Sequence, residues 1–161
     1  MTPVVNTELD LTISRVIRAP RAAVWAAWAD PRSFEQWWIP APLACKVMEM
    51  DLRPGGAFMT KMSEDGQRFT PHLNACFLQI ETAQRIVFSN ALTGGWRPAD
   101  KFYPTALTAI ITFRDHPEGT HYAAHVMHKS AADRDTHNDM GFAEGWGAVM
   151  EQLAKLVENP K

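Results

Sequence analysis

Between residues 43 and 128 the chain repeats one pattern, in which short runs of alternating apolar and polar residues are separated by tight-turn sequences. The turns read "RPGG", "EDGQ", "ETAQ" and "DHPEG". Alternation with a period of two is typical of a strand with one buried face, and such short turns join neighbouring strands that run in opposite directions. Six runs of this kind therefore predict an antiparallel sheet.

A further strand and two short helices are predicted before this region. "LDLTISRVI" alternates like a strand, and Pro20 both ends it and suits the first turn of a helix. Asp30 followed by Pro31 is typical of an N-cap and a first helical position, so a second short helix follows at once. Its apolar side is predicted to be buried and consists of Phe34, Trp37 and Trp38.

The chain ends in a predicted long helix. Ser130 with Asp133 three positions later resembles a capping box, and the helical pattern continues to about Val157, just before Pro160. An apolar stripe at helical spacing predicts one buried face: Phe142, Trp146, Val149, Leu153 and Leu156.

Three glycines interrupt this helix. Gly141 and Gly145 lie together beside the apolar stripe, whereas Gly147 lies near the polar side. A glycine inside a helix costs about 1 kcal/mol relative to alanine, so an edge without side chains needs an explanation. Two remain open: another backbone packs closely against this edge, or the missing side chains leave a cavity for a ligand.

Taken together, the elements predict an α+β fold in which one long helix lies across the concave face of a curved antiparallel sheet of about seven strands. With 46% hydrophobic and 21% charged residues, the chain has the composition of an ordinary globular protein. We expect a flexible tail at residues 1–8 and one domain at residues 9–157.

Charge and cysteine content restrict the classes of function. A net charge of −2 gives no electrostatic surface for nucleic acid, and no apolar run is long enough to span a membrane. The first residues lack a signal peptide, and Cys45 and Cys76 have neither metal-type nor redox-type spacing. We therefore expect a cytoplasmic protein with two free thiols, no nucleic-acid partner and no membrane insertion.

Several segments resemble the activator of heat-shock-protein ATPase homologue-like family, within the START/SRPBCC helix-grip superfamily. They are "RAPRAAVWAAWADPRSFEQWW" near the start, "RPGGAFMTKM", "FLQIETAQRIVFS", and an ending that looks like the glycine- and tryptophan-bearing helix of a bacterial subgroup. The resemblance implies a helix-grip fold with an apolar cavity between the long helix and the sheet. The superfamily also includes lipid binders, cyclases and co-chaperones, so the resemblance implies little about function.

Strand parity and the position of the helix nominate residues for such a cavity. Most are aromatic residues and methionines near the N-terminal half of the helix, and Trp96 and Phe102 come from a long loop at 93–105 that is suited to a lid. The candidate ligand contacts are Trp38, Phe58, Met62, His72, Phe88, Asn90, Trp96, Phe102, Phe113, His125, Met140, Gly141, Phe142 and Gly145.

Catalytic signals are sparse. No metal-ligand set, nucleophile motif, paired carboxylates or phosphate loop occurs, so neither a metal nor a cofactor is expected. His125 and His137 are the candidates for a general base. Three hypotheses follow: binding of a small hydrophobic or amphipathic ligand, a cyclase- or hydrolase-type enzyme that uses a cavity histidine, and a co-chaperone-like or homodimeric interaction module with an exposed apolar patch around Trp37 and Trp38.

Overall fold

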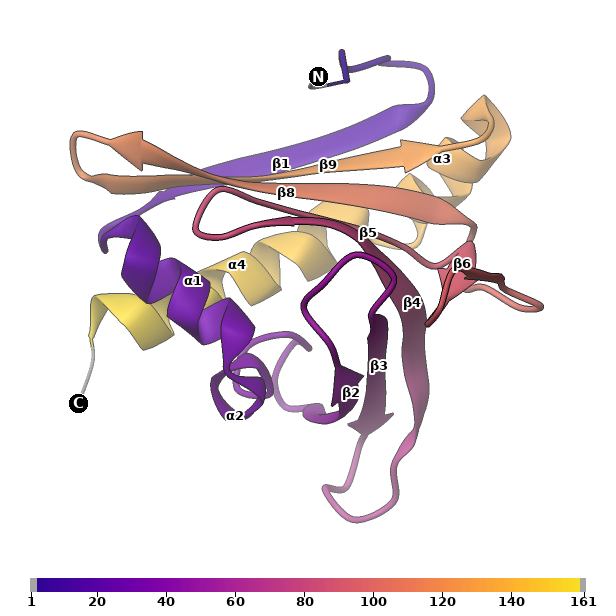
Figure 1. The fold of residues 1–161 in the computed structure, drawn as a ribbon, viewed down its shortest axis with the longest axis horizontal. Helices are drawn as coiled ribbons and strands as arrows, with labels where there is room; N and C mark the ends of the chain where they lie inside the picture. Colours follow the sequence, from indigo (N-terminus) through magenta and orange to yellow (C-terminus); the bar gives the residue numbers. More distant parts are fainter. Residues whose placement is uncertain (1–2, 160–161) are drawn as a thin grey trace.

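Seven strands form one antiparallel sheet in the order β1-β9-β8-β5-β4-β3-β2. The computed structural model describes residues 3–159. Figure 1 shows the sheet curving around the helices, as the alternating pattern and short turns predicted. Along the chain the elements are β1 (Asp10–Ile17), α1 (Arg21–Ala29), α2 (Pro31–Phe34), β2 (Ala44–Met50), β3 (Ala57–Ser63), β4 (Thr70–Glu81), β5 (Arg85–Ser89), β6 (Leu92–Thr93), β7 (Arg97–Pro98), β8 (Leu107–His116), β9 (Gly119–His128), α3 (Ala131–Asp139) and α4 (Phe142–Glu158).

Four hairpins account for most of the sheet, and two further pairings complete it: β5 with β8, and β1 with β9. β1 pairs with β9, so that Leu11 lies opposite Val126. The β8–β9 hairpin turns at Gly119, which has φ +142°, and a Cβ there would lie 2.3 Å from the carbonyl oxygen of Ile17. Only glycine fits that position without a shift of the backbone, so the turn also fixes how closely β1 approaches. β6 and β7 form a separate two-stranded sheet across residues 92–98, so the first half of the predicted 93–105 loop is a small hairpin.

The two short helices begin as their sequences predicted. Pro20 occupies the N-cap of α1 with an extended backbone, and Pro31 is the first residue of α2. The Asp30 carboxylate accepts hydrogen bonds from the backbone N–H of Arg32, at 3.3 Å, and from the Ser33 hydroxyl, at 2.9 Å. The first contact satisfies a backbone N–H group that has no partner within the helix, and the second ties the Ser33 side chain to the N-cap.

The prediction of one helix from 130 to about 157 is wrong, because the segment forms two helices. The Ser130 hydroxyl accepts from the N–H of Asp133, at 3.1 Å, and starts α3, which ends at Asp139. Gly141 then has φ +93° and becomes the N-cap of α4. A left-handed residue cannot continue a right-handed helix, and glycine adopts this conformation at little cost. Gly141 therefore allows the chain to change direction between α3 and α4.

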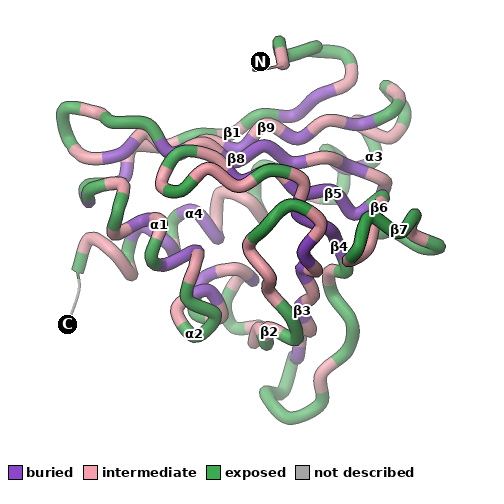
Figure 2. Tube along the Cα trace, in the orientation of Figure 1, coloured by how far each residue is buried: buried purple, intermediate pink, exposed green. Residues whose placement is uncertain are grey.

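Aromatic side chains fill the core between the short helices and the sheet. Trp28 is fully buried, and its ring lies within 6.4 Å, centroid to centroid, of five others: Phe34, Trp37, Trp38, Phe58 and Phe88. Its indole N–H donates to the hydroxyl of Tyr122, at 2.8 Å, which satisfies a buried donor. Buried positions follow the inner sides of the strands and α4 in Figure 2.

The C-terminal half of α4 anchors the helix. Val149, Met150, Leu153 and Ala154 are buried, and α4 lies beside α1 beneath the sheet (Figure 1). Cys45 is half-buried and Cys76 is buried, both as free thiols. Across residues 3–159, no helix combines the length and apolar character needed to cross a membrane.

Candidate functional site

A cavity of about 260 Å³ lies between the N-terminal half of α4 and the concave side of the sheet. Side chains from the segment after α2, from strands β4, β5 and β8, from the 103–104 loop and from both C-terminal helices surround it. It opens to the surface at Tyr103, whose side chain is 74% exposed. The lining residues are Trp38, Pro40, His72, Leu73, Phe88, Asn90, Tyr103, Pro104, Leu107, His137, Gly145, Trp146 and Val149.

Gly145 forms the open part of the α4 wall. A Cβ built on Gly145 would meet no atom within 4 Å, whereas one on Gly147 would lie 3.7 Å from Cδ1 of Ile13. Close packing is therefore wrong at Gly145, while Gly147 has an ordinary neighbour in β1. Gly145 follows Phe142 and precedes Trp146 in the sequence, and it lines the cavity. A larger side chain at this position would take up part of the cavity volume.

Trp38 forms the wall opposite and differs from the other core tryptophans. The indole N–H of Trp37 donates to the carbonyl oxygen of Ala27, at 3.0 Å, and that of Trp28 donates to Tyr122. The Nε1 atom of Trp38 is buried and has no hydrogen-bond partner within residues 3–159. A buried donor without a partner costs about 1–3 kcal/mol. The Trp38 N–H is such a donor, and protein atoms cover it, so it is the rest of the Trp38 ring that lines the cavity.

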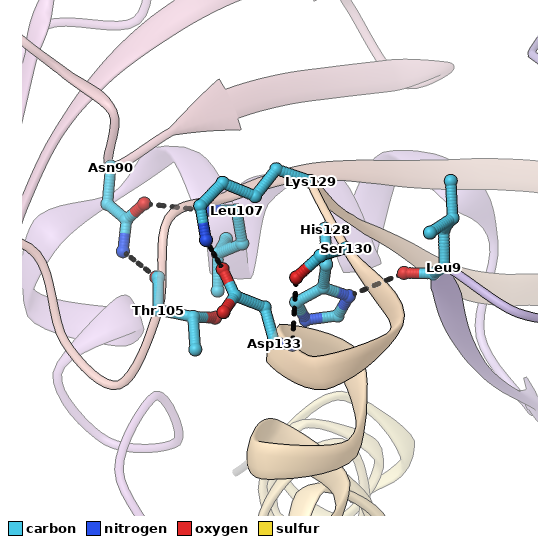
Figure 3. A network of polar contacts seen from close by, with 8 residues as sticks. All are labelled: Leu9, Asn90, Thr105, Leu107, His128, Lys129, Ser130 and Asp133. Carbon is cyan, nitrogen blue, oxygen red and sulfur yellow. Dashed lines mark hydrogen bonds and ion pairs between the residues drawn. The ribbon is translucent and has the colours of Figure 1, made fainter.

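Asn90 holds the loop at the mouth of the cavity against the end of the sheet. Its amide nitrogen donates to the carbonyl oxygen of Thr105, at 2.9 Å, and its amide oxygen accepts from the N–H of Leu107, at 2.8 Å (Figure 3). Both polar ends of Asn90 are thereby engaged with the backbone that follows Tyr103 and Pro104. Asn90 holds the loop beside the cavity and is not needed as a free polar contact.

A register shift in the sheet brings two neighbouring residues of β4 to the same cavity. Thr60 pairs with Leu73 and Lys61 pairs with Pro71, so His72 is an extra residue without a direct partner. Such a bulge re-aims side chains that would otherwise alternate between the two faces. His72 and Leu73 consequently both line the cavity, and Nδ1 of His72 lies 3.0 Å from the Thr60 hydroxyl.

His137 lines the end of the cavity near α3, and His128 lies behind it. Nε2 of His128, in β9, lies 2.9 Å from Nδ1 of His137, in α3. On its other side, Nδ1 of His128 lies 2.9 Å from the carbonyl oxygen of Leu9 (Figure 3). The ring of His137 also packs edge-on against Phe142, with 5.2 Å between centroids. These contacts fix the plane of the His137 ring at the cavity wall.

The cavity is electrically neutral at ordinary pH. No Asp, Glu, Lys or Arg is among its lining residues in the described chain. Burial, together with the neighbouring His128, lowers the pKa of His137 to about 4, and burial also lowers the pKa of His72. Both imidazoles are therefore uncharged near pH 7, and the walls offer apolar surface with a few uncharged polar atoms.

Six of the residues predicted from the sequence meet at this cavity. They come from β4, β5, α3 and α4, from the residue after β5 and from the segment after α2, and they are Trp38, His72, Phe88, Asn90, His137 and Gly145. The proposed general base His125 lies on the other face of β9, where its Nε2 contacts the Asp10 carboxylate at 2.7 Å. His125 and His128 are three positions apart in β9, so strand alternation directs their side chains to opposite faces of the sheet.

The other predicted contacts lie outside the cavity lining. Phe58 stacks on Phe77 in the core, and Phe113 packs with Trp25 and Tyr122 at a different place in the core. Phe142 is buried behind the wall, against Trp146 and His137, and Gly141 is the N-cap of α4. Three other candidates have large side chains that are about half exposed: Trp96, Phe102 and Met140. Met62 lies in a groove beside the β3–β4 turn.

Some lining residues escaped the sequence reasoning. Trp146 and Val149 carried the helical stripe and so were predicted as core, although they also face the cavity. Leu73 was missed because regular strand alternation does not anticipate the bulge. Leu107 lies at the start of β8, on the same side as Ala109 and Ile111. Pro40, Tyr103 and Pro104 reach the site through loop geometry, for which the sequence has no local signal.

Within residues 3–159, no three His, Cys, Asp or Glu side chains are grouped so as to hold a metal ion. A seven-stranded antiparallel sheet gripping a C-terminal helix over a cavity defines the helix-grip class of proteins. The sequence profile of the family described as Activator of Hsp90 ATPase homolog 1-like protein matches residues 18–158. The chain belongs to this family.

Solved structures agree with the assignment. Protein NE0264 from Nitrosomonas europaea is 34% identical, with a TM-score of 0.88 over 99% of this chain and 100% of its own. Protein Ms6760 from Mycobacterium smegmatis is 25% identical, with a TM-score of 0.77 over 96% of this chain and 93% of its own. Protein CV1439 from Chromobacterium violaceum is 24% identical, with a TM-score of 0.72 over 93% of this chain and 97% of its own. A search of curated proteins finds no match. The fold commonly binds hydrophobic ligands.

Proposed function

We propose that this protein binds a small hydrophobic or amphipathic molecule in the cavity between α4 and the sheet. The observation that carries the proposal is the open space beside Gly145, at a point where a helix would gain stability from almost any other residue. A protein that kept this glycine only for packing would have an atom close to it.

The size of the cavity restricts the ligand. A dry engineered cavity of about 150 Å³ accepts benzene, and pockets for drug-sized ligands span about 300–1,000 Å³. At about 260 Å³, this cavity accommodates a molecule larger than one ring but not a long-chain lipid. The aromatic walls, Trp38, Phe88 and Trp146, favour a flat ring system through offset or edge-to-face contacts.

Binding of a fluorescent apolar probe, together with mass spectrometry of molecules extracted from the purified protein, tests the proposal. We expect saturable, stoichiometric binding to the unaltered chain. Gly145→Leu fills the cavity and should abolish that binding. Gly147→Ala is the matched control, because it also replaces a glycine of α4 but faces Ile13, and it should bind normally. Equal binding by Gly145→Leu and the unaltered chain would overturn the proposal.

A catalytic role remains a second candidate because His137 is present at the cavity wall. A cyclase- or hydrolase-type enzyme needs a base within reach of its substrate, and His137 meets that requirement while His125 does not. Turnover of a bound ligand that is lost in His137→Phe, with binding retained, would establish this role.

The co-chaperone-like or homodimeric alternative has less support. It predicts a sizeable exposed apolar patch, for which Trp37 and Trp38 were the candidates. Trp37 is 1% exposed and Trp38 lines the cavity, so these two residues do not form such a patch.

A further inference from the structure

We infer that the cavity selects an uncharged ligand that carries a hydroxyl group, and that Nε2 of His137 accepts the hydrogen bond from this hydroxyl. The inference rests on the proposed function and adds the chemical class of ligand. It depends on a chain of three groups, which begins at a backbone carbonyl of residue 9 and ends at the cavity.

The carbonyl of Leu9 determines which nitrogen carries the proton in each ring. A carbonyl oxygen only accepts, so Nδ1 of His128, at 2.9 Å, must carry a hydrogen and donate it. In the neutral ring, Nε2 of His128 then has a free lone pair and accepts. Its partner Nδ1 of His137, at 2.9 Å, is consequently the donor. Neutral His137 therefore has its hydrogen on Nδ1 and a lone pair on Nε2.

This lone pair is available to a ligand. His137 lines the cavity, and among residues 3–159 the only hydrogen bond of its side chain is the one from Nδ1 to His128. Ring contacts with His128, at 5.1 Å, and Phe142, at 5.2 Å, are both close to perpendicular and keep the imidazole from rotating. A fixed acceptor in an apolar site favours ligands that donate a hydrogen bond over matched ligands that cannot, because its lone pair otherwise stays unpaired.

The neutral walls favour an uncharged donor. A bound carboxylate or ammonium would lose its hydration without meeting an opposite charge, since the lining has no charged side chain. Burial also keeps His137 itself uncharged, with its pKa lowered to about 4. An aromatic hydroxyl, whose pKa is about 10 as in tyrosine, stays neutral near pH 7 and donates well.

Three two-ring probes of nearly equal size test the inference on the full chain: 2-naphthol, 2-methoxynaphthalene and 2-naphthoate. Affinities are measured by calorimetry at pH 7.5. We expect 2-naphthol to bind at least tenfold more tightly than the methyl ether, and the anionic naphthoate to bind more weakly than the ether. In His137→Phe, which keeps the ring contact with Phe142, the preference for the naphthol should disappear while the ether still binds.

A second measurement does not depend on any variant. The nitrogen-15 shifts of the imidazoles at pH 7.5 report which nitrogen is protonated, and both His128 and His137 should carry their hydrogen on Nδ1. A hydrogen on Nε2 of His137 would overturn the inference. Equal affinity for the naphthol and its ether would also overturn it, whereas failure of all three probes to bind would instead contradict the proposed function.

Discussion

The side chain of Gln152, in α4, donates to the carbonyl oxygen of Trp37 at 3.0 Å. The same amide nitrogen donates to the carbonyl oxygen of Ile39 at 3.0 Å, and the amide oxygen accepts from the N–H of Ala41 at 2.7 Å. Gln152 thus holds the backbone on both sides of Trp38. One helix thereby supplies the open wall of the cavity through Gly145 and positions the opposite wall through Gln152.

Gln152→Leu should lower the free energy of unfolding by about 1–3 kcal/mol, because it leaves two carbonyls and one N–H without these partners. Urea denaturation followed by tryptophan fluorescence measures the change. Glu151→Leu is the matched control, since its carboxylate only pairs with Lys155 at the surface and should matter by less than about 0.5 kcal/mol. Equal stability of the two variants would show that Gln152 does not hold this segment.

Gly145→Leu should leave the free energy of unfolding unchanged or raise it by about 0.5–1 kcal/mol. The added side chain enters open space, and leucine has the higher helix propensity. Thermal and urea unfolding of this variant should therefore match or exceed the unaltered chain. A loss of about 1–3 kcal/mol, as overpacking produces, would mean that the space beside Gly145 is closed in solution.

Gly141→Ala should destabilise the protein by about 1–2 kcal/mol, because φ +93° is unfavourable for a residue with a Cβ. Gly141→Asn should cost less, since asparagine tolerates the left-handed conformation better. Denaturation of the two variants side by side separates backbone strain from loss of packing. Equal destabilisation by Ala and Asn would contradict the strain explanation.

Stability should fall as the pH is lowered from about 6.5 to about 4. Unfolded His137 takes up a proton near pH 6.5, whereas burial lowers its pKa in the folded chain to about 4. Between these values the unfolded state binds more protons, so its contribution to stability is complete above pH 6.5 and is lost as the pH falls through 4. Urea midpoints between pH 4 and 8 measure the slope, which His137→Gln should reduce; an unchanged slope would contradict the assignment.

Much of the fold was predictable because its signals are local. The period of two, the turn sequences and the helix starts at Pro20, Asp30 and Ser130 depend on residues a few positions apart, and the structure confirms the strand, helix and sheet classes that they predicted. The break at Gly141 was missed, because a glycine within a helical pattern is compatible both with a continuous helix and with a left-handed turn.

The candidate site was less predictable from the sequence, as two histidines show. His137 was chosen for its place beside the glycines of the helix, and it lines the cavity; His125 was chosen on a strand and points to the opposite face. Alternation along a strand shows which residues share a face with His125, but it places that face inside or outside only when the inward side of β9 is known. That side is determined by packing against distant elements.

The sequence by itself determined the α+β class, the order of the seven main strands and the starts of α1, α2 and α3, because alternation, turns and caps depend on neighbours in the chain. Only the tertiary structure decided what surrounds the cavity. The bulge at His72, the hydrogen bonds of Gln152 and the contact from Leu9 through His128 to His137 each join residues that the sequence does not visibly relate. The polarity of the cavity depends on these long-range contacts, because the partner of one ring nitrogen fixes which nitrogen carries the proton.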